Sequence, residues 1–203
     1  MQLVLATNNK DKVKEIKHLL EDLPITILTH DDFLDFPDVE ETGDTLEANA
    51  LLKARAIAEF CDLPALADDS GLEVDALDGA PGVFSSRYAG EDVTYEDNNR
   101  KLLKELQGVP PEKRTARFRC VIAVAWNDHE TNTVEGVAEG IIAEDLATGQ
   151  GFGYDPLFYY PPKEMRFSDM TIEQKNQVSH RGLALQKIRD VIIERLNSNL
   201  PLR

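Results

Sequence analysis

Residues 65–82 read ALADDSGLEVDALDGAPG, an apolar run followed directly by two carboxylates and a Ser-Gly pair. The run over residues 63–68 predicts a buried strand, and the Asp-Asp-Ser-Gly sequence predicts a turn that ends it. The neighbouring carboxylates of Asp68 and Asp69 repel each other, which lowers stability unless both lie in water or a positive group lies beside them. The stretch therefore predicts either a solvated turn or a binding site at the end of a strand.

The segments on either side of this stretch are mixed strands and helices. Further strands are predicted at residues 2–7, 25–28, 116–126 and 131–142, the last two joined by a hairpin at 127–130, and a glycine-rich loop at 149–162 runs into a short strand. Helices are predicted at residues 8–23, 45–60, 95–107, 171–178 and 182–196. Because these elements do not follow strict βαβ alternation, they predict an α/β protein with a mixed sheet. The length of the chain allows one domain or two small ones.

Several helix ends carry capping residues. Asp44 with Glu47, Thr94, and Thr171 with Gln174 are the predicted caps. Asn49 and Lys53 lie four residues apart, so one helix face is expected to carry both. The last helix is expected to turn four apolar residues inward: Leu185, Ile188, Ile192 and Leu196.

The composition limits the classes of partner. The chain has 203 residues, 42% of them hydrophobic, and a formal net charge of -15 from 37 acids against 22 Lys and Arg. A surface with this much negative charge repels nucleic acid and anionic membranes. We therefore expect a small molecule as the partner. Cys61 and Cys120 are expected to be reduced, buried thiols. The N-terminal apolar run is too short for a signal peptide, and no apolar stretch reaches about 18 residues, so we expect a cytoplasmic protein.

The segment Thr7–Lys12, TNNKDK, lies between a predicted strand and a predicted helix. Unpaired backbone N–H groups and the helix dipole favour an anion at such a helix start, and Lys10 and Lys12 add positive charge there. The segment predicts a phosphate cradle, although an ordinary cap with surface lysines has the same pattern. It lacks the Gly-Lys-Ser/Thr pattern of a Walker loop.

Two further carboxylates lie in an acidic segment. Between Lys17 and Lys53 there are ten acids and no Lys or Arg, and Glu40 and Glu41 are among the acids. Together with the aspartates at 68 and 69 they could supply the oxygen ligands that Mg²⁺ takes, alongside water and substrate phosphates. A solvated acidic loop is the alternative interpretation.

Two later segments suit a nucleotide. In GFGYDP, residues 151–156, the glycines allow close backbone approach and Phe152 and Tyr154 could stack on a base, although such a loop can also pack on the core. In KNQVSHR, residues 175–181, Arg181 offers a planar fork and His180 a donor, although the pair could be only a capping turn between helices.

In order and spacing, five segments resemble the inosine triphosphate pyrophosphatase family, also described as XTP/dITP diphosphatases. They are LATNNKDKVKEI, EETGDTLEANALLKARA, ALADDSGLEVDALDGAPGVFSSRYAG, GFGYDPLF and EQKNQVSHRGLAL. The resemblance implies a single domain over residues 1–203, with a long mixed twisted sheet that is flanked by helices and forms two lobes around a central cleft. It implies a Mg²⁺-dependent homodimer. It also implies hydrolysis of ITP, dITP and XTP to the monophosphate and pyrophosphate.

The resemblance also implies roles for individual residues. Glu40 and Asp69 match the metal ligands, and Asp69 also matches the proton acceptor. The residues that match substrate contacts are Thr7, Asn8, Asn9, Lys10, Asp11, Lys12, Lys53, Ser70, Phe152, Gly153, Tyr154, Asp155, Lys175, His180 and Arg181. Asn8 departs from the family, which usually has Gly there.

These roles lead to a mechanistic hypothesis and to rivals. Water would attack the α-phosphorus with pyrophosphate leaving, and Asp69 would act either as the base or by orienting a water. Donors such as Arg181, or backbone N–H groups of the SHRG segment, would read the 6-oxo group of the base. The rivals are a related pyrophosphatase for other modified nucleotides, a non-catalytic nucleotide-binding module, and a metal-dependent nuclease, which the net charge disfavours.

Overall fold

The computed structural model describes residues 1–147 and 152–198 of the 203-residue chain. The chain divides into two compact units. Unit 1 takes Met1–Asp69, Cys120–Gly136 and the chain from Arg181 onward, and unit 2 takes Ser70–Arg119 and Val137–His180. A single domain over residues 1–203, and a cleft between two lobes, stay predictions.

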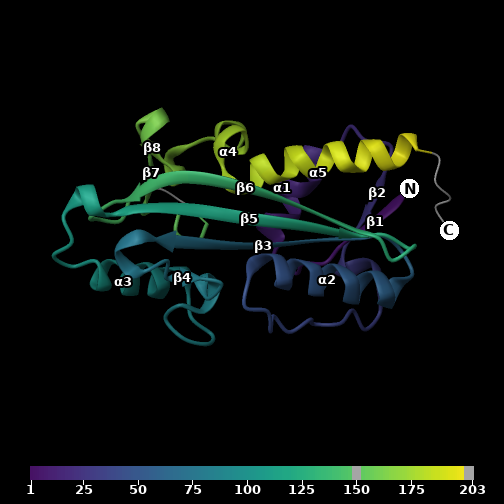
Figure 1. Cartoon of the computed structure of the whole chain (residues 1–203), viewed down its shortest axis with the longest axis horizontal. Helices are drawn as coiled ribbons and strands as arrows, with labels where there is room; N and C mark the ends of the chain where they lie inside the picture. The colour runs from purple at the N-terminus through teal and green to yellow at the C-terminus, as the bar shows by residue number, and fades with distance from the viewer. Residues whose placement is uncertain (148–151, 199–203) are drawn as a thin grey trace. The chain divides into compact units, whose positions relative to one another are not determined.

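The described residues form a mixed sheet. Its strands are β1 (Gln2–Leu5), β2 (Thr26–Leu28), β3 (Ala65–Val74), β4 (Pro81–Gly82), β5 (Thr115–Ala125), β6 (Thr131–Ile142), β7 (Phe158–Tyr160) and β8 (Met165–Arg166). They are hydrogen-bonded in the order β2-β1-β3-β5-β6-β7-β8, with β4 on β3 (Figure 1). The pairs β1–β2 and β1–β3 are parallel, whereas β3–β4, β6–β7 and β7–β8 are antiparallel. The predicted α/β class with a mixed sheet is confirmed.

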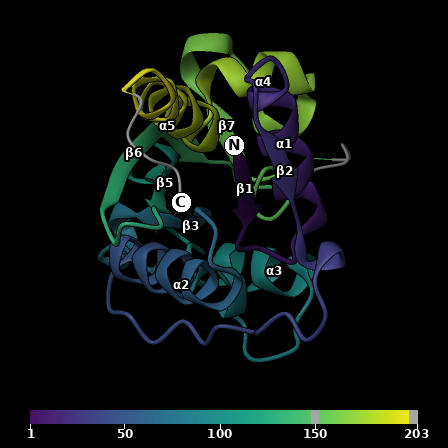
Figure 2. The same ribbon diagram turned by 90° about the vertical axis from the view of Figure 1, so that its right-hand side faces the viewer.

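In unit 1, helices cover both faces of the parallel strands. The helices α1 (Lys10–Leu20) and α5 (His180–Asn197) lie on one face, and α2 (Leu46–Cys61) lies on the other (Figures 1 and 2). The core on the α1 and α5 side includes Leu3, Leu5, Ile16, Leu20, Leu66, Ile122, Val124, Leu185, Ile188 and Ile192, with Leu196 packed against it. The inward face predicted for the last helix is therefore confirmed. Burial on both faces explains why β1 and the start of β3 are apolar and buried.

In unit 2, aromatic rings build much of the core. The Phe118 ring lies 4.6 Å from the Phe158 ring and 5.9 Å from the Phe167 ring, measured between centroids. The helices of this unit are α3 (Tyr95–Glu105) and α4 (Ile172–Val178). Both begin at predicted caps: Thr94 and Thr171 form capping boxes with the residues three positions later.

Gly140 on β6 gives a test of this packing. A Cβ there would lie 2.6 Å from the backbone oxygen of Tyr159 and closer still to the buried Phe158 ring. Gly140→Ala is therefore expected to lower the free energy of unfolding by about 1–3 kcal/mol, because neither neighbour can move away freely. Urea unfolding measures this, with Glu139→Ala on the same strand as a control whose change stays within about 0.5 kcal/mol. Equal stability of Gly140→Ala and wild type would contradict the packing.

The predicted turn at Asp68–Gly71 is wrong. β3 continues through these four residues to Val74, and Pro81–Gly82 pairs with it as β4. The strand continues because Asp68 and Asp69 are buried beside cationic side chains rather than placed in water. Of the two alternatives drawn from the sequence, the positive neighbour is the correct one.

Three smaller predictions are also wrong. The N-cap of α2 is Thr45, whose Oγ1 accepts from the Ala48 N–H, and not Asp44. His180 and Arg181 form the first turn of α5 rather than a turn between helices. Cys120 is buried as expected, but Cys61 is only half-buried because it lies at the last position of α2; both are free thiols.

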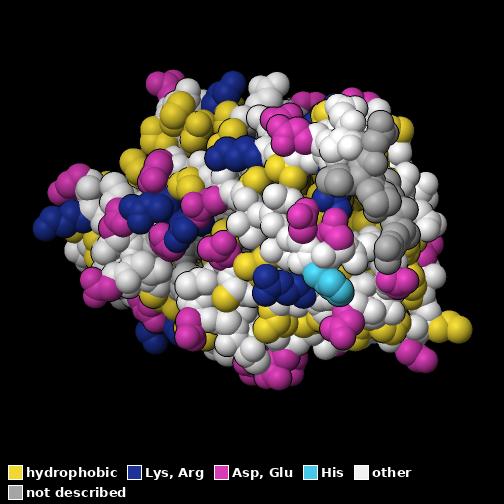
Figure 3. Space-filling model, turned by 45° about the vertical axis from the view of Figure 1, so that its right-hand side comes forward, with side chains coloured by type: hydrophobic (Ala, Val, Ile, Leu, Met, Phe, Trp, Pro, Cys, Tyr) yellow, Lys and Arg dark blue, Asp and Glu magenta, His cyan; other side chains and the backbone are white. Residues whose placement is uncertain are grey.

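The surface carries charge of both signs. On the face that Figure 3 shows, Asp and Glu side chains lie among Lys and Arg side chains and uncharged ones. Within residues 1–147 and 152–198, no helix has the length and apolar character needed to cross a membrane.

Candidate functional site

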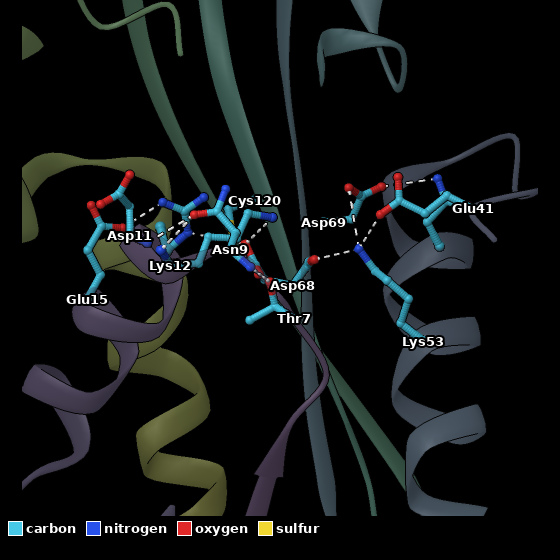
Figure 4. Close-up of polar contacts among 12 residues, drawn as sticks. Thr7, Asn9, Asp11, Lys12, Glu15, Glu41, Lys53, Asp68, Asp69 and Cys120 are labelled. Atoms are coloured by element: carbon cyan, nitrogen blue, oxygen red, sulfur yellow. Dashed lines mark hydrogen bonds and ion pairs between the residues drawn. The ribbon is translucent and has the colours of Figure 1, made fainter. Parts of the chain in front are cut away.

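Asp68 and Asp69 point to opposite faces of β3. Successive side chains of a strand alternate between its faces, and the partners of the two aspartates differ accordingly. Asp68 faces Lys12 of α1 and Arg181 of α5, whereas Asp69 faces Lys53 of α2 (Figure 4). The expectation that both carboxylates bind one metal ion together is therefore wrong, and unit 1 contains two separate ionic clusters.

The first cluster neutralises a fully buried carboxylate. Asp68 Oδ2 lies 3.1 Å from Lys12 Nζ and accepts from Arg181 Nε at 3.1 Å. The Nη1 of Arg181 donates to Glu15 Oε2 at 2.6 Å. Burial alone would raise the pKa of Asp68, but the charges of Lys12, Arg181 and Lys53 outweigh it and hold the pKa well below its usual range. Asp68 is thus an ionised anchor for two cations.

The segment Thr7–Lys12 runs into the first turn of α1, which carries Lys12. Asn9 is the N-cap, and its Oδ1 accepts from the N–H groups of Asp11 and Lys12 at 3.0 and 3.3 Å. The Oγ1 of Thr7 accepts from the Asn9 N–H at 3.2 Å, and Asn8 and Lys10 are exposed. The predicted cap is confirmed, but Lys12 is not the surface lysine of that alternative, because it pairs with buried Asp68. Phosphate binding there stays a prediction.

The second cluster surrounds Asp69. Its Oδ2 accepts from Asn49 Nδ2 at 3.1 Å, and its Oδ1 lies 3.8 Å from Lys53 Nζ. The same Nζ donates to Glu41 Oε1 at 2.5 Å and to the backbone oxygen of Asp68 at 2.8 Å. The shared face predicted for Asn49 and Lys53 is confirmed. Figure 4 shows Glu41, Lys53 and Asp69 pointing toward one another.

The electrostatics of the second cluster favour a further cation. Burial raises the pKa of Asp69, Lys53 lowers it, and the neighbouring Glu41 raises it again, with a net increase. Burial lowers the pKa of Lys53, but Asp69, Glu41 and Asp68 outweigh this and raise it. An extra positive charge beside Asp69 would stabilise its ionised form.

The ligand set suits Mg²⁺ only when other ligands join it. No group of three or more His, Cys, Asp or Glu side chains that could hold a metal occurs in the part of the chain that the structure describes. Mg²⁺ is usually held by one or two carboxylates together with waters and substrate phosphates, so the Asp69 and Glu41 carboxylates fit it. Glu40, the predicted second ligand, is exposed, and its side chain forms no hydrogen bond or ion pair with any residue that the structure describes.

Unit 2 holds the remaining predicted substrate contacts. In the segment Phe152–Asp155, the Asp155 Oδ2 accepts from the Phe152 N–H at 3.2 Å and from Lys175 Nζ at 2.6 Å. The backbone oxygen of Gly153 accepts from Asn99 Nδ2 at 2.9 Å. These bonds fix the segment on α3 and α4. Gly151, part of the quoted motif, lies outside the described residues.

The aromatic side chains of this segment differ in exposure. Tyr154 is 4% exposed and its hydroxyl donates to the backbone oxygen of Ser85, so its ring packs in the core. Phe152 is half-buried and lies edge-on to Tyr95, with centroids 5.1 Å apart, and 6.0 Å from the Lys175 Nζ. Of the two rings proposed to stack on a base, Phe152 is the accessible one.

Two predicted residues remain in unit 2. The His180 ring is buried and stacks on Phe118, with centroids 4.5 Å apart and planes 12° apart. Ser70 lies half-buried on β3. The structure therefore brings Lys12 together with Arg181, Lys53 together with Asp69, and Phe152–Asp155 together with Lys175. Asn8, Lys10 and Glu40 are exposed outside these groups.

Some residues at these clusters were not predicted. Glu15, Asn99 and Tyr95 each contact a predicted residue, and none has a motif that singles it out. Asn49 was placed on the correct helix face by its spacing from Lys53, but a role for it follows only from its contacts.

Comparison with known proteins gives consistent results. A family model described as the Ham1 family matches residues 3–191. A curated protein of Desulforamulus reducens, named dITP/XTP pyrophosphatase, is 53% identical over 192 residues, which cover 95% of this chain and 96% of that protein. A protein of the same name from Geobacter sulfurreducens is 52% identical over 189 residues, covering 93% of this chain and 95% of that protein.

Solved structures have the same fold. The HAM1 protein from Coxiella burnetii matches with a TM-score of 0.88 and 44% identity, over 96% of this chain and 99% of that one. A nucleoside-triphosphatase / dITP/XTP pyrophosphatase from Mycobacterium abscessus matches with a TM-score of 0.76 and 39% identity, over 93% of this chain and 98% of that one.

Proposed function

This chain belongs to the Ham1 family, and from that premise we propose that it is a Mg²⁺-dependent pyrophosphohydrolase that converts the non-standard purine nucleotides ITP, dITP and XTP to the monophosphate and pyrophosphate. It thereby removes these nucleotides from the nucleotide pool. Its near full-length relatives named dITP/XTP pyrophosphatase support the activity. One structural observation supports the placement of the chemistry: the buried Asp69 carboxylate beside Lys53 and Glu41.

A divalent cation at this carboxylate would reverse the local charge. Mg²⁺ polarises phosphoryl oxygens and makes a coordinated water more acidic. We assign Asp69 as one ligand of this cation. The family resemblance implies Glu40 as the second ligand. The structure places a further carboxylate, that of Glu41, beside Lys53.

The other charged residues position the triphosphate. The side chains of Lys12 and Lys53 are 15% and 11% exposed, and each places its ammonium group beside an aspartate of β3. Both lysines are proposed to contact phosphate oxygens. Lys175 in unit 2, which forms an ion pair with Asp155 in this structure, is proposed to do the same. Catalysis by such groups rests on positioning and on offsetting the charge of the leaving pyrophosphate.

Asp69 is proposed to accept the proton of the attacking water. A bound cation would lower the pKa of this carboxylate, and in that case Asp69 would instead orient a water that the metal makes more acidic. The water attacks the α-phosphorus, the bond from that phosphorus to the bridging oxygen breaks, and pyrophosphate leaves with the bond's electron pair.

Base selection is proposed to depend on hydrogen-bond donors of the SHRG segment, residues 179–182. Arg181 is 2% exposed and its guanidinium contacts Asp68 and Glu15, so the backbone N–H groups of the SHRG segment become the better candidates to read a 6-oxo group. A site that hydrogen-bonds this group rejects ATP by about 10⁴-fold or more, because its donors are left unpaired.

Turnover of a nucleotide panel tests the function. Pyrophosphate release from ITP, XTP, GTP and ATP, measured with and without Mg²⁺, is expected to be fast for ITP and XTP, slow for ATP, and absent without the metal. Equal rates on all four would exclude base selection. A preference for other modified nucleotides would identify a related pyrophosphatase, and binding without release would identify a non-catalytic module.

The remaining features belong to the same proposal. We expect a homodimer that acts in the cytoplasm on small-molecule nucleotides, without nucleic-acid or membrane partners. The net charge of -15 supports the last point. Sedimentation of the purified chain measures the oligomeric state.

A further inference from the structure

The carboxamide of Asn49 is completely buried and uses both of its ends. Its Oδ1 accepts from the backbone N–H of Gly43 at 2.7 Å, and its Nδ2 donates to Asp69 Oδ2 at 3.1 Å. An amide is a side chain that donates at one end and accepts at the other, so these two bonds fix its orientation. One side chain of α2 therefore connects β3 to the acidic segment that precedes the helix.

This connection joins the two parts of the chain that are proposed to supply metal ligands. Asp69 is at one end, and Gly43 at the other end lies two residues after Glu41 in the chain. The bond to Nδ2 occupies one carboxylate oxygen of Asp69 and thereby sets the direction in which the other oxygen points. The bond from Gly43 fixes the backbone that carries Glu40 and Glu41.

Close packing at Gly43 supports a specific contact between the backbone of residue 43 and the side chain of Asn49. A Cβ at this position would lie 2.7 Å from the Asn49 Oδ1 and 2.8 Å from the Ala48 Cβ. The backbone can therefore approach Asn49 this closely only because residue 43 has no side chain. Substitution at Gly43 provides a way to break the link without changing Asn49.

We infer that Asn49 is a positioning residue for the divalent cation: it holds the Asp69 carboxylate and the segment carrying Glu40 and Glu41 in the arrangement that the cation requires. The inference rests on the proposed function. Mg²⁺ demands near-ideal octahedral geometry, so small displacements of its ligands weaken binding. Side chains that orient metal ligands typically contribute about 10- to 100-fold in metal affinity or activity.

Manganese affinity tests the inference directly. The Mn²⁺ dissociation constant is measured by electron paramagnetic resonance on the full chain, in the presence of an ITP analogue with nitrogen bridging the α- and β-phosphorus. Asn49→Ala and Gly43→Ala are each expected to weaken Mn²⁺ binding by about 10-fold or more. Thermal unfolding of each variant establishes that it is folded, and Gly43→Ala alone decides the outcome if Asn49→Ala does not fold.

Asn98 of α3 provides the matched control. It is also a buried amide that uses both ends: Oδ1 accepts from the Ala89 N–H at 2.7 Å, and Nδ2 donates to the Ser86 backbone oxygen at 3.0 Å. These partners are backbone groups rather than a carboxylate. Asn98→Ala is expected to lower the unfolding temperature while Mn²⁺ affinity stays unchanged.

The outcomes separate the inference from the proposed function. Unchanged Mn²⁺ affinity in a folded site variant, or an equal loss in Asn98→Ala, overturns the assignment of Asn49. If wild type itself releases no pyrophosphate from the nucleotide panel, the proposed function fails. If wild type is active and only the site variants lose Mn²⁺ affinity, both stand.

Discussion

Replacing Asp69 by Asn is expected to lower kcat for ITP by at least ~10²-fold, the scale of general-base catalysis. The variant removes the negative charge and the proton-accepting oxygen and keeps the size of the side chain. It is expected to fold, because Lys53 keeps Glu41 and the backbone oxygen of Asp68 as partners. Steady-state rates of pyrophosphate release and a thermal unfolding curve measure the two effects separately.

Asp75→Asn is the control for this prediction. It makes the same chemical change at a largely exposed carboxylate just beyond the end of β3. Its rate is expected to match wild type. A folded Asp69→Asn variant with near-normal turnover would show that Asp69 does not take part in the reaction.

The second large effect concerns stability rather than turnover. Asp68→Asn leaves Lys12 and Arg181 facing a neutral amide in a site where the aspartate is 1% exposed. Removing one partner of a buried ion pair leaves an uncompensated buried charge and costs about 3–5 kcal/mol. The free energy of unfolding is expected to fall by roughly this amount. The loss is smaller to the extent that Glu15, which accepts a hydrogen bond from Arg181, still compensates the charge of that arginine.

Urea unfolding measures this loss. Asp22→Asn is the control, since Asp22 pairs with Arg189 of α5 at the surface, where ion pairs contribute little, and its unfolding midpoint is expected to stay close to that of wild type. If Asp68→Asn were as stable as wild type, the buried cluster would not have the role in the fold that its contacts indicate.

Local signals predicted most of the secondary structure. Thr94 was identified as a cap from its place before a helical pattern, Thr171 from Gln174 three positions later, and the inward face of the last helix from its spacing. Such features depend on neighbours within a turn or two of helix, which a sequence displays directly.

The course of β3 could not be predicted in the same way. Two adjacent aspartates normally indicate a turn, and the strand tolerates them only because Lys12, Lys53 and Arg181 approach from three helices. Arg181 is 113 residues from Asp68 along the chain. Spacing cannot show contacts of this length, so neither the separation of the two aspartates nor the bridging role of Asn49 was apparent from the residues alone.

The family resemblance named candidate site residues without their geometry. Tyr154 and Arg181 match substrate contacts of the family, and in the structure one packs in the core and the other contacts buried carboxylates. Their roles toward a nucleotide stay predictions. On the structure, Phe152, Lys175 and the cluster around Asp69 are the stronger candidates for contacts with a nucleotide.

The most direct test of the account is the position of a cation in a crystal that contains Mn²⁺ and a non-hydrolysable ITP analogue. The anomalous signal of Mn²⁺ locates the ion independently of the protein model. We expect an ion about 2.1 Å from an Asp69 carboxylate oxygen and also bonded to phosphate oxygens of the analogue. An ion and analogue bound elsewhere, with Asp69 still contacting only protein groups, would contradict the account.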